Sequence, residues 1–175
     1  ALRACIRVKN GLRCTPLLEF CSRDQTAMRT RCGATGRPLI LASVYMPRDT
    51  PHAPPQEFAL LVEYARRSGN ELVVGCDSNS HNSVWGCGDT NTRGKSLLEF
   101  IVSSGLMISN VGSVPTFFSR VGNSVIDLTL HSENLEGRVL DWRVSSEPSL
   151  SDHRHILFSI GDFSPDNILS RNPRR

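Results

Sequence analysis

The chain has 175 residues, 39% of them hydrophobic and 21% charged, which suits one folded domain and excludes an intrinsically disordered chain. Its 20 basic and 17 acidic residues leave a net charge of +3, which permits a nucleic-acid partner without requiring one. Since no apolar segment resembles a signal peptide or a membrane span, we expect an intracellular protein with no membrane partner.

Strands dominate the first part of the chain. Residues 4–9 alternate apolar and polar side chains and then meet Asn10-Gly11, a strong signal for a hairpin turn. Three more strands are expected at residues 17–21, 25–32 and 39–46. A strand that begins almost at Ala1 indicates a fragment, so we expect the first strands of the fold to be missing.

Two amphipathic helices are expected among the later strands. Apolar residues recur at three- and four-residue steps in residues 55–67 and again in residues 93–104. Residues 71–77 form a short apolar run that ends in polar side chains, which predicts a buried strand whose end faces a cleft. Further strands are expected at residues 107–110, 116–119, 124–131, 138–144 and 155–160.

This order of elements predicts two packed sheets with helices outside them. We expect one domain over residues 1–163. Residues 164–175 are polar, contain two prolines and are expected to form a linker or tail.

The six cysteines contain no C-x-x-C pair, which indicates reduced intracellular thiols. Two alternatives stay open at this point. An even number of cysteines is compatible with disulfides in a secreted protein. Cys76, His81 and Cys87 are also candidate zinc ligands, although their spacing departs from the usual zinc patterns.

Asp77 and Asn79 stand two residues apart at the end of an expected strand. In an extended backbone both side chains project from the same face, so a carboxylate and an amide would share one pocket. That pair suits phosphodiester hydrolysis, since the acid can deprotonate water while the amide orients water or phosphate. The alternative is a polar turn, because residues 77–82 have a turn-forming composition.

Asp127 interrupts a run of good strand formers, a place where Asp is disfavoured. It therefore needs either a fixed partner, such as a histidine, or a face of the sheet that is open to water. Asp152 and His153 lie at the entrance of the last strand and point in different directions, so one can reach a metal and the other a phosphate. An ordinary surface Asp-His pair is the alternative interpretation.

Several short motifs occur together in one order along the chain. These are SVYMP at residues 43–47, GCDSN at 75–79, SVIDL at 124–128 and SDH at 151–153. In this order they resemble the endonuclease/exonuclease/phosphatase superfamily. Four further stretches resemble the endonuclease domain of arthropod non-LTR retrotransposons, particularly the site-specific rDNA or telomere-repeat lineage. They are HNSVWG at residues 81–86, TRG at 92–94, PTF at 115–117 and DWRV at 141–144.

The resemblance implies an α/β (α+β) fold, a four-layer α-β-β-α sandwich of two mainly antiparallel sheets, with its first strands missing here. It also implies a Mg²⁺-dependent DNA endonuclease, with Mn²⁺ able to substitute. Such an enzyme nicks double-stranded DNA in the nucleus and leaves a 3′-hydroxyl for reverse transcription. The implied partners are double-stranded DNA and the reverse transcriptase domain of the same polyprotein.

The resemblance assigns roles to residues that match its motifs. Asp77 would position or deprotonate the attacking water, and Asn79 would orient the water and the phosphate. Asp127 would orient His153, which would stabilise the pentacovalent phosphate.

Other roles rest on the same resemblance or on charge alone. Tyr45 would line the pocket and donate to a phosphate oxygen, and Asp152 would help to hold the metal. Candidate phosphate contacts are Arg93, Lys95 and Arg120, for which solvated surface charge is the alternative.

The front of the chain departs from the family. The family's first strand supplies an Asn, and the next strand supplies a Gln-Glu pair whose Glu is the main metal ligand. Neither occurs before Tyr45, and Glu19, the only early glutamate, follows the stretch that matches a later family strand. We therefore expect an incomplete metal site, an unpaired sheet edge and weak or no nicking by this chain alone.

Two other functions stay open from the sequence. One is a noncatalytic relic or DNA-contacting module that kept the fold after losing its active site. The other is a different phosphodiesterase or phosphatase of the superfamily, acting on sugar or lipid phosphates or on abasic sites. The target DNA sequence has no residue code in this chain, because it depends on surface loops and on DNA deformability.

Overall fold

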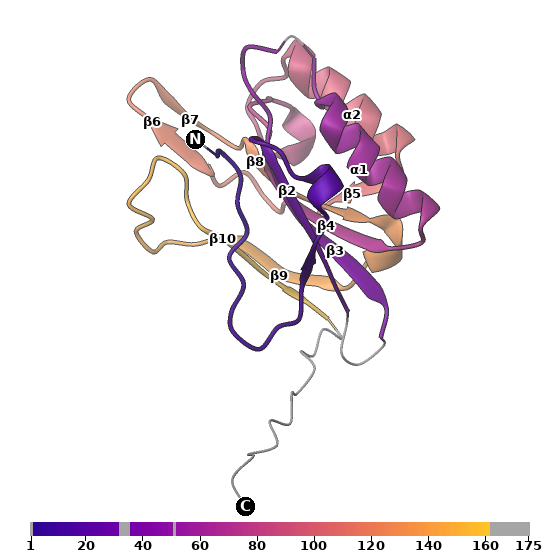
Figure 1. Ribbon diagram of the computed structural model, residues 1–175. Helices are drawn as coiled ribbons and strands as arrows, with labels where there is room; N and C mark the ends of the chain where they lie inside the picture. The colour runs from indigo at the N-terminus through magenta and orange to yellow at the C-terminus, as the bar shows by residue number, and fades with distance from the viewer. Residues whose placement is uncertain (1, 32–35, 51, 162–175) are drawn as a thin grey trace, which may run out of the picture.

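The computed structural model describes residues 2–31, 36–50 and 52–161, and its ribbon is drawn in Figure 1. One sheet has six strands. Their order is β1 (Thr15–Pro16), β2 (Gln25–Arg31), β3 (Pro38–Tyr45), β4 (Glu71–Asp77), β8 (Asp127–Ser132) and β5 (Leu106–Ile108). Neighbouring strands are antiparallel except β3 and β4, which run parallel.

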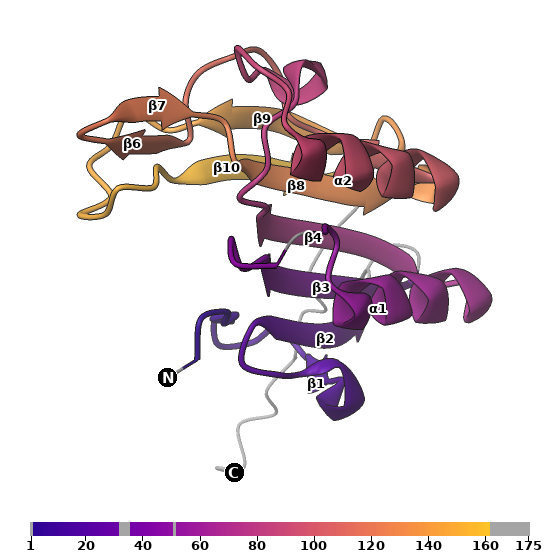
Figure 2. The ribbon, with the colours of Figure 1, turned by 90° about the horizontal axis from the view of Figure 1, so that it is seen from above.

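Both α-helices of the described residues lie on one face of this sheet (Figure 2). α1 (Gln56–Arg67) follows Pro55, and α2 (Thr92–Ser103) follows Asn91, whose side chain caps the helix by accepting from Gly94 N. Both helices therefore agree with the sequence prediction to within one residue at each end. The apolar stripes of the helices are fully buried against β3, β4 and β8, through Phe58, Leu61, Leu97 and Ile101.

A smaller β-layer covers part of the opposite face. β9 (Val139–Val144) pairs antiparallel with β10 (Ile156–Ile160). Phe158 and Ile160 of β10 pack on Leu39 and Val73 of the six-stranded sheet. β6 (Phe117–Ser119) and β7 (Gly122–Ser124) form a separate hairpin beside this layer, as Figure 2 shows. The predicted α/β sandwich with two β-layers is confirmed.

The predicted strand at residues 4–9 is wrong, because the described segment contains no strand there. The segment crosses the face of β2 instead. Thr26 Oγ1 donates to Ala4 O at 3.1 Å, and Thr30 Oγ1 donates to Arg13 O at 2.8 Å. Threonine side chains thus take the place of a backbone ladder, since the segment lies over the sheet and not beside it.

The predicted strand at residues 17–21 is also wrong. Leu17 N donates to Ala27 O, and Phe20 N then donates back to Leu17 O. The backbone therefore closes into a 3₁₀ turn, η1 (Leu18–Phe20), which buries Leu17 in the core.

The predicted strand at residues 124–131 is split into two. β7 ends at Ser124 and β8 begins at Asp127. Between them, Thr116 Oγ1 accepts from Ile126 N at 3.1 Å and from Asp127 N at 3.0 Å. At this break the buried hydroxyl of Thr116 thus accepts the backbone N–H hydrogen bonds that a neighbouring strand would otherwise accept.

The predicted tail at residues 164–175 lies outside the described residues, as does Cys32 at the end of the strand predicted over residues 25–32. Within the described ranges, no helix has the length and apolar character needed to cross a bilayer.

The start of α2 presses against the loop that follows β4. A Cβ added to Gly94 would lie 1.8 Å from His81 O. Asn91 joins the same two segments, because its side chain accepts from Gly94 N and from His81 N. The helix start therefore determines the path of the chain just beyond the end of β4.

We expect Gly94→Ala to lower the free energy of unfolding by about 1–3 kcal/mol or more, because a backbone carbonyl cannot swing aside as a flexible side chain can. Urea denaturation followed by circular dichroism measures this change. Gly88→Ala is the matched control, since a Cβ added to this exposed glycine meets no atom within 4 Å. Equal stability of the two variants would contradict the close approach of helix and loop.

Candidate active site

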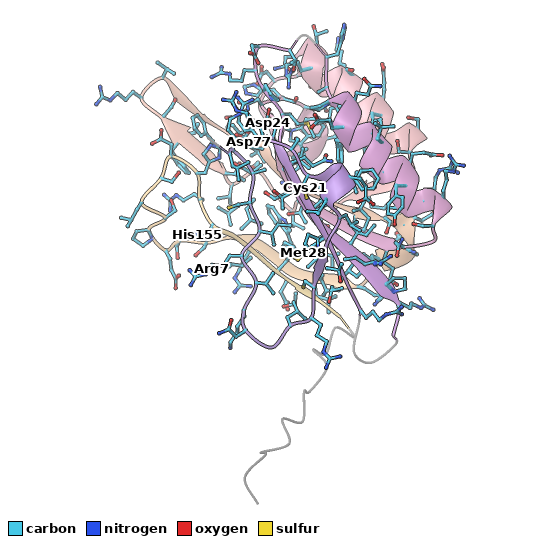
Figure 3. All side chains as sticks on the ribbon, viewed as in Figure 1. Arg7, Cys21, Asp24, Met28, Asp77 and His155 are labelled. Carbon is cyan, nitrogen blue, oxygen red and sulfur yellow. The ribbon has the colours of Figure 1, made fainter. Side chains whose placement is uncertain are left out.

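Three neighbouring strands bring polar side chains into one row. Tyr45 on β3 pairs with Asp77 on β4, and Asp77 pairs with Asp127 on β8. Paired residues on adjacent strands project from the same face of a sheet. The three side chains therefore share the face opposite α1 and α2, at the end where β3 and β4 finish. Figure 3 labels Asp77 at this end.

Small residues lie directly behind this row. They are Ser43, Gly75 and Thr129, which pair with one another in the same registers. Ile156 and Phe158 of β10 form the facing wall. The result is a hollow of about 440 Å³ that opens beside the row of Tyr45, Asp77 and Asp127.

His153 enters the hollow from the loop before β10. Its Nδ1 lies 2.9 Å from each carboxylate oxygen of Asp127, and its Nε2 lies 3.8 Å from Oδ2 of Asp77. A carboxylate only accepts hydrogen bonds, so Nδ1 carries a hydrogen and donates a hydrogen bond to Asp127. Because 3.8 Å is too long for a hydrogen bond, Nε2 makes no direct hydrogen bond to Asp77 and faces the hollow that both residues line.

Residues that carried no assigned role in the sequence hold this pair in place. The Phe117 ring lies 4.9 Å from the His153 ring, and the two residues form an isolated β-bridge. Thr116 Oγ1 and Asn110 Nδ2 hold Asp127 through its backbone N and O, each at 3.0 Å. Thr116 and Phe117 belong to the PTF stretch, so their signal is present in the sequence, whereas Asn110 carries none.

Asn79 does not continue the extended backbone of β4. Its φ of +47° lies in the left-handed region, which Asn tolerates better than most residues. Asn79 N donates to Asp77 Oδ1 at 3.2 Å, and its side-chain Nδ2 donates to Met46 O at 3.1 Å. The expectation of an extended strand through residue 79 is therefore wrong. The backbone N–H of Asn79 contacts Asp77, but Asn79 does not line the hollow.

Asp77 has an unusual acidity. Burial, and secondly the charge of Asp127 on the next strand, raise the pKa of its carboxyl from 3.8 to about 6. His153, the backbone N–H of Asn79 and the charge of Arg48 oppose this rise. Since the unfolded chain keeps the lower pKa, ionisation of Asp77 costs folding free energy as the pH rises from about 4 to about 6.

We expect Asp77→Asn to stabilise the fold at pH 7.5 by roughly 1–3 kcal/mol, because the neutral amide escapes both burial of charge and repulsion by Asp127. The gain should shrink through the window between pH 6 and pH 4 and vanish below it, where wild-type Asp77 is protonated in both states. Thermal unfolding at pH 4, 5.5 and 7.5 measures it. A loss of stability, or a gain that does not change with pH, would contradict this account of Asp77.

Arg93 faces the loops at the ends of β3 and β4. Its Nε donates to Asn79 O and its Nη2 donates to Ser78 O, both at 3.3 Å, while its Nη1 donates to Thr50 O. Burial lowers the pKa of this guanidinium. Arg93 thus ties α2 to two loops of the site, and its predicted contact with phosphate stays a prediction.

Three other predicted residues do not line the hollow. They are Lys95 on α2, Arg120 in the turn between β6 and β7, and Asp152 in the loop before β10. All three are exposed, and their side chains form no hydrogen bond or ion pair with the rest of the described chain. The structure therefore brings Tyr45, Asp77, Asp127 and His153 together, as the sequence predicts, but leaves Asp152 outside this group.

The described residues do not make a complete metal site. Within the described ranges, no group of three or more His, Cys, Asp or Glu side chains is arranged to hold a metal ion. Asp77 and Asp127 offer the hard oxygen donors that Mg²⁺ prefers, but both oxygens of Asp127 are engaged by His153. The fit to Mg²⁺ is therefore incomplete.

The alternative zinc ligands do not converge. Cys76 is buried among the core residues beneath the helices, where desolvation raises the pKa of its thiol. Cys87 donates to Val125 O, and His81 Nδ1 lies 2.8 Å from Asp89 Oδ1. The cysteines of the described residues are free thiols.

Comparison with known proteins agrees with the fold. The structure is similar to the endonuclease domain of TRAS1, a telomere-specific non-LTR retrotransposon, with a TM-score of 0.75 and 25% identity over 87% of this chain and 70% of that chain. It is also similar in fold to the 3′-5′ exonuclease NExo of Neisseria meningitidis, with a TM-score of 0.56 and 19% identity over 86% of this chain and 70% of that chain. The AP endonuclease LMAP of Leishmania major matches with a TM-score of 0.63 and 14% identity over 87% of this chain and 62% of that chain.

The sandwich thus has the fold of the endonuclease/exonuclease/phosphatase superfamily. No curated protein sequence matches the chain significantly. A family model described as endonuclease-reverse transcriptase matches residues 39–157, which is more than half of the chain. The chain belongs to the endonuclease-reverse transcriptase family.

Proposed function

We propose that this chain is the endonuclease domain of a non-LTR retrotransposon and hydrolyses one phosphodiester bond of double-stranded DNA. The observation that carries the proposal is the imidazole of His153, held by Asp127 and facing Asp77 at an open hollow. Family membership and the likeness to the TRAS1 domain support DNA as the substrate. The nick would leave a 3′-hydroxyl, in the nucleus, for the reverse transcriptase domain of the same polyprotein.

Asp77 is the proposed base. With a pKa of about 6, its carboxylate is ionised at neutral pH yet is a better proton acceptor than an ordinary aspartate. Both Asp77 and His153 line the open hollow, and Oδ2 of Asp77 lies 3.8 Å from Nε2 of His153. In this role Asp77 removes a proton from the water as the water attacks phosphorus.

His153 is the proposed stabiliser of the phosphate. In its imidazolium form, Nε2–H donates to a phosphate oxygen while Asp127 balances the charge through Nδ1–H. The second Nδ2 hydrogen of Asn79 remains free to orient the water or the phosphate, because the first is donated to Met46 O. Tyr45 would donate its hydroxyl to a phosphate oxygen from the neighbouring strand.

The outer residues receive weaker assignments. Lys95 and Arg120 are exposed and remain proposed contacts for DNA phosphates. Asp152 remains a proposed metal ligand, although its side chain does not line the hollow. We propose that Arg93 acts mainly by holding the turn that carries Asn79.

A supercoiled-plasmid assay with excess protein and Mg²⁺ tests the proposed activity. We expect slow conversion to the open-circular form, and a loss of roughly 10²–10⁴-fold in rate for Asp77→Asn and for His153→Ala. His155→Ala is the matched control, since this exposed histidine, labelled in Figure 3, lies two residues from His153 and does not line the hollow. Nicking that is undiminished in both site variants would overturn the proposal.

Divalent metal dependence is a separate prediction, based on the superfamily and not on a complete ligand set in this chain. We expect an excess of EDTA to abolish nicking, and added Mg²⁺ or Mn²⁺ to restore it. The bound metal would neutralise charge that develops on the phosphate. Nicking that persists after EDTA treatment and desalting would contradict this prediction.

A further inference from the structure

The hollow is poor in positive charge for a site that would bind DNA. Two carboxylates, those of Asp77 and Asp127, line it, and phosphate groups beside them meet repulsion. Among the described residues that line it, Arg3 is the only lysine or arginine. Its position near the first residue of the chain gave no hint of this placement in the sequence.

Arg3 is held in a fixed orientation by two neighbours. Its Nε and Nη2 each donate to one carboxylate oxygen of Asp24, and its guanidinium carbon lies 4.4 Å from the centre of the Tyr45 ring. Two backbone hydrogen bonds also hold Arg3, Asp24 and Tyr45 together. Arg3 N donates to Arg23 O and Tyr45 N donates to Asp24 O, both at 2.8 Å. A planar guanidinium that is stacked and paired in this way is already ordered before a ligand binds.

The Arg3 guanidinium keeps hydrogen-bond donors that Asp24 does not use. A guanidinium has five N–H groups, and Asp24 accepts two of them, so three remain on the edge turned away from Asp24. The Arg3 side chain keeps 32% of its surface exposed, so Asp24 and Tyr45 do not enclose it completely. Phosphate is the ligand that matches such a fork of N–H groups.

The order of the strands determines which phosphate Arg3 meets. Asp24 precedes β2, Tyr45 ends β3 and Asp77 ends β4, so Tyr45 lies between Arg3 and the proposed base. Neighbouring strands are about 4.8 Å apart, so the guanidinium, stacked on Tyr45, lies to the side of the position between Asp77 and His153. A phosphate next to the cleaved one on the same strand lies within reach.

We infer that Arg3 binds a DNA phosphate that flanks the scissile phosphate, with Asp24 and Tyr45 as the residues that orient it. This inference rests on the proposed function, since it assumes that the hollow receives a DNA strand. Arg3 is a binding residue in this scheme and takes no part in proton transfer. Its loss should weaken DNA binding without changing the chemistry at Asp77.

Fluorescence anisotropy with a labelled 30-base-pair duplex, in EDTA and at several salt concentrations, tests the inference without requiring cleavage. We expect Arg3→Ala to raise the Kd for the duplex by roughly three- to tenfold. The slope of log Kd against log salt concentration should fall by about 0.9, the value for one lost phosphate contact. Arg3→Lys should keep the slope, because it keeps the charge. Arg67→Ala, which removes an exposed arginine at the far end of α1, should leave both quantities unchanged.

The possible outcomes separate the two proposals. If the wild type binds and nicks DNA but Arg3→Ala keeps its Kd and salt slope, the inference about Arg3 is wrong and the proposed function stands. A weaker Kd with an unchanged salt slope would mean that Arg3 only supports Tyr45, which also overturns the inference. If the wild type does not bind the duplex, both proposals are wrong. Unfolding curves for each variant exclude a loss of fold as the cause.

Discussion

The register of three strands is the constraint on which the site depends. Because β3, β4 and β8 align Tyr45, Asp77 and Asp127 side by side, two carboxylates come close enough for one to raise the pKa of the other. A shift of one residue in either register would turn one of these side chains toward the helices. His153, from a segment far along the chain, then completes the row by bonding to both oxygens of Asp127.

This arrangement sets stability against function. An ionised aspartate that is buried beside a second acid weakens the fold at neutral pH, yet the same surroundings make Asp77 a better proton acceptor. The core beneath the helices supplies the compensating stability, since the helix-facing residues of these strands are almost fully buried. On the other face, the small residues Ser43, Gly75 and Thr129 leave room for a ligand in the hollow.

The loops around the row are held by contacts that do not take part in the proposed chemistry. Arg93 binds the carbonyls of Ser78, Asn79 and Thr50, while Gly94 lets α2 approach His81. On the other side of the row, Arg3 stacks on the ring of Tyr45 and is held there by Asp24. Side chains that meet a phosphate must be ordered before it arrives, and these contacts supply that order.

The sequence by itself determined the two helices, most of the strands and the residues of the row, because periodicity and short motifs are local properties. Only the tertiary structure decided that residues 4–9 cross β2 without pairing, that Asn79 turns away from the strand, and that Asp152 stays exposed. Those outcomes depend on contacts with distant partners, such as Thr26 and Met46, which no local pattern encodes. The placement of Arg3 against Tyr45 has the same cause, since 42 positions separate residues 3 and 45 in the chain and only the folded sheet brings them together.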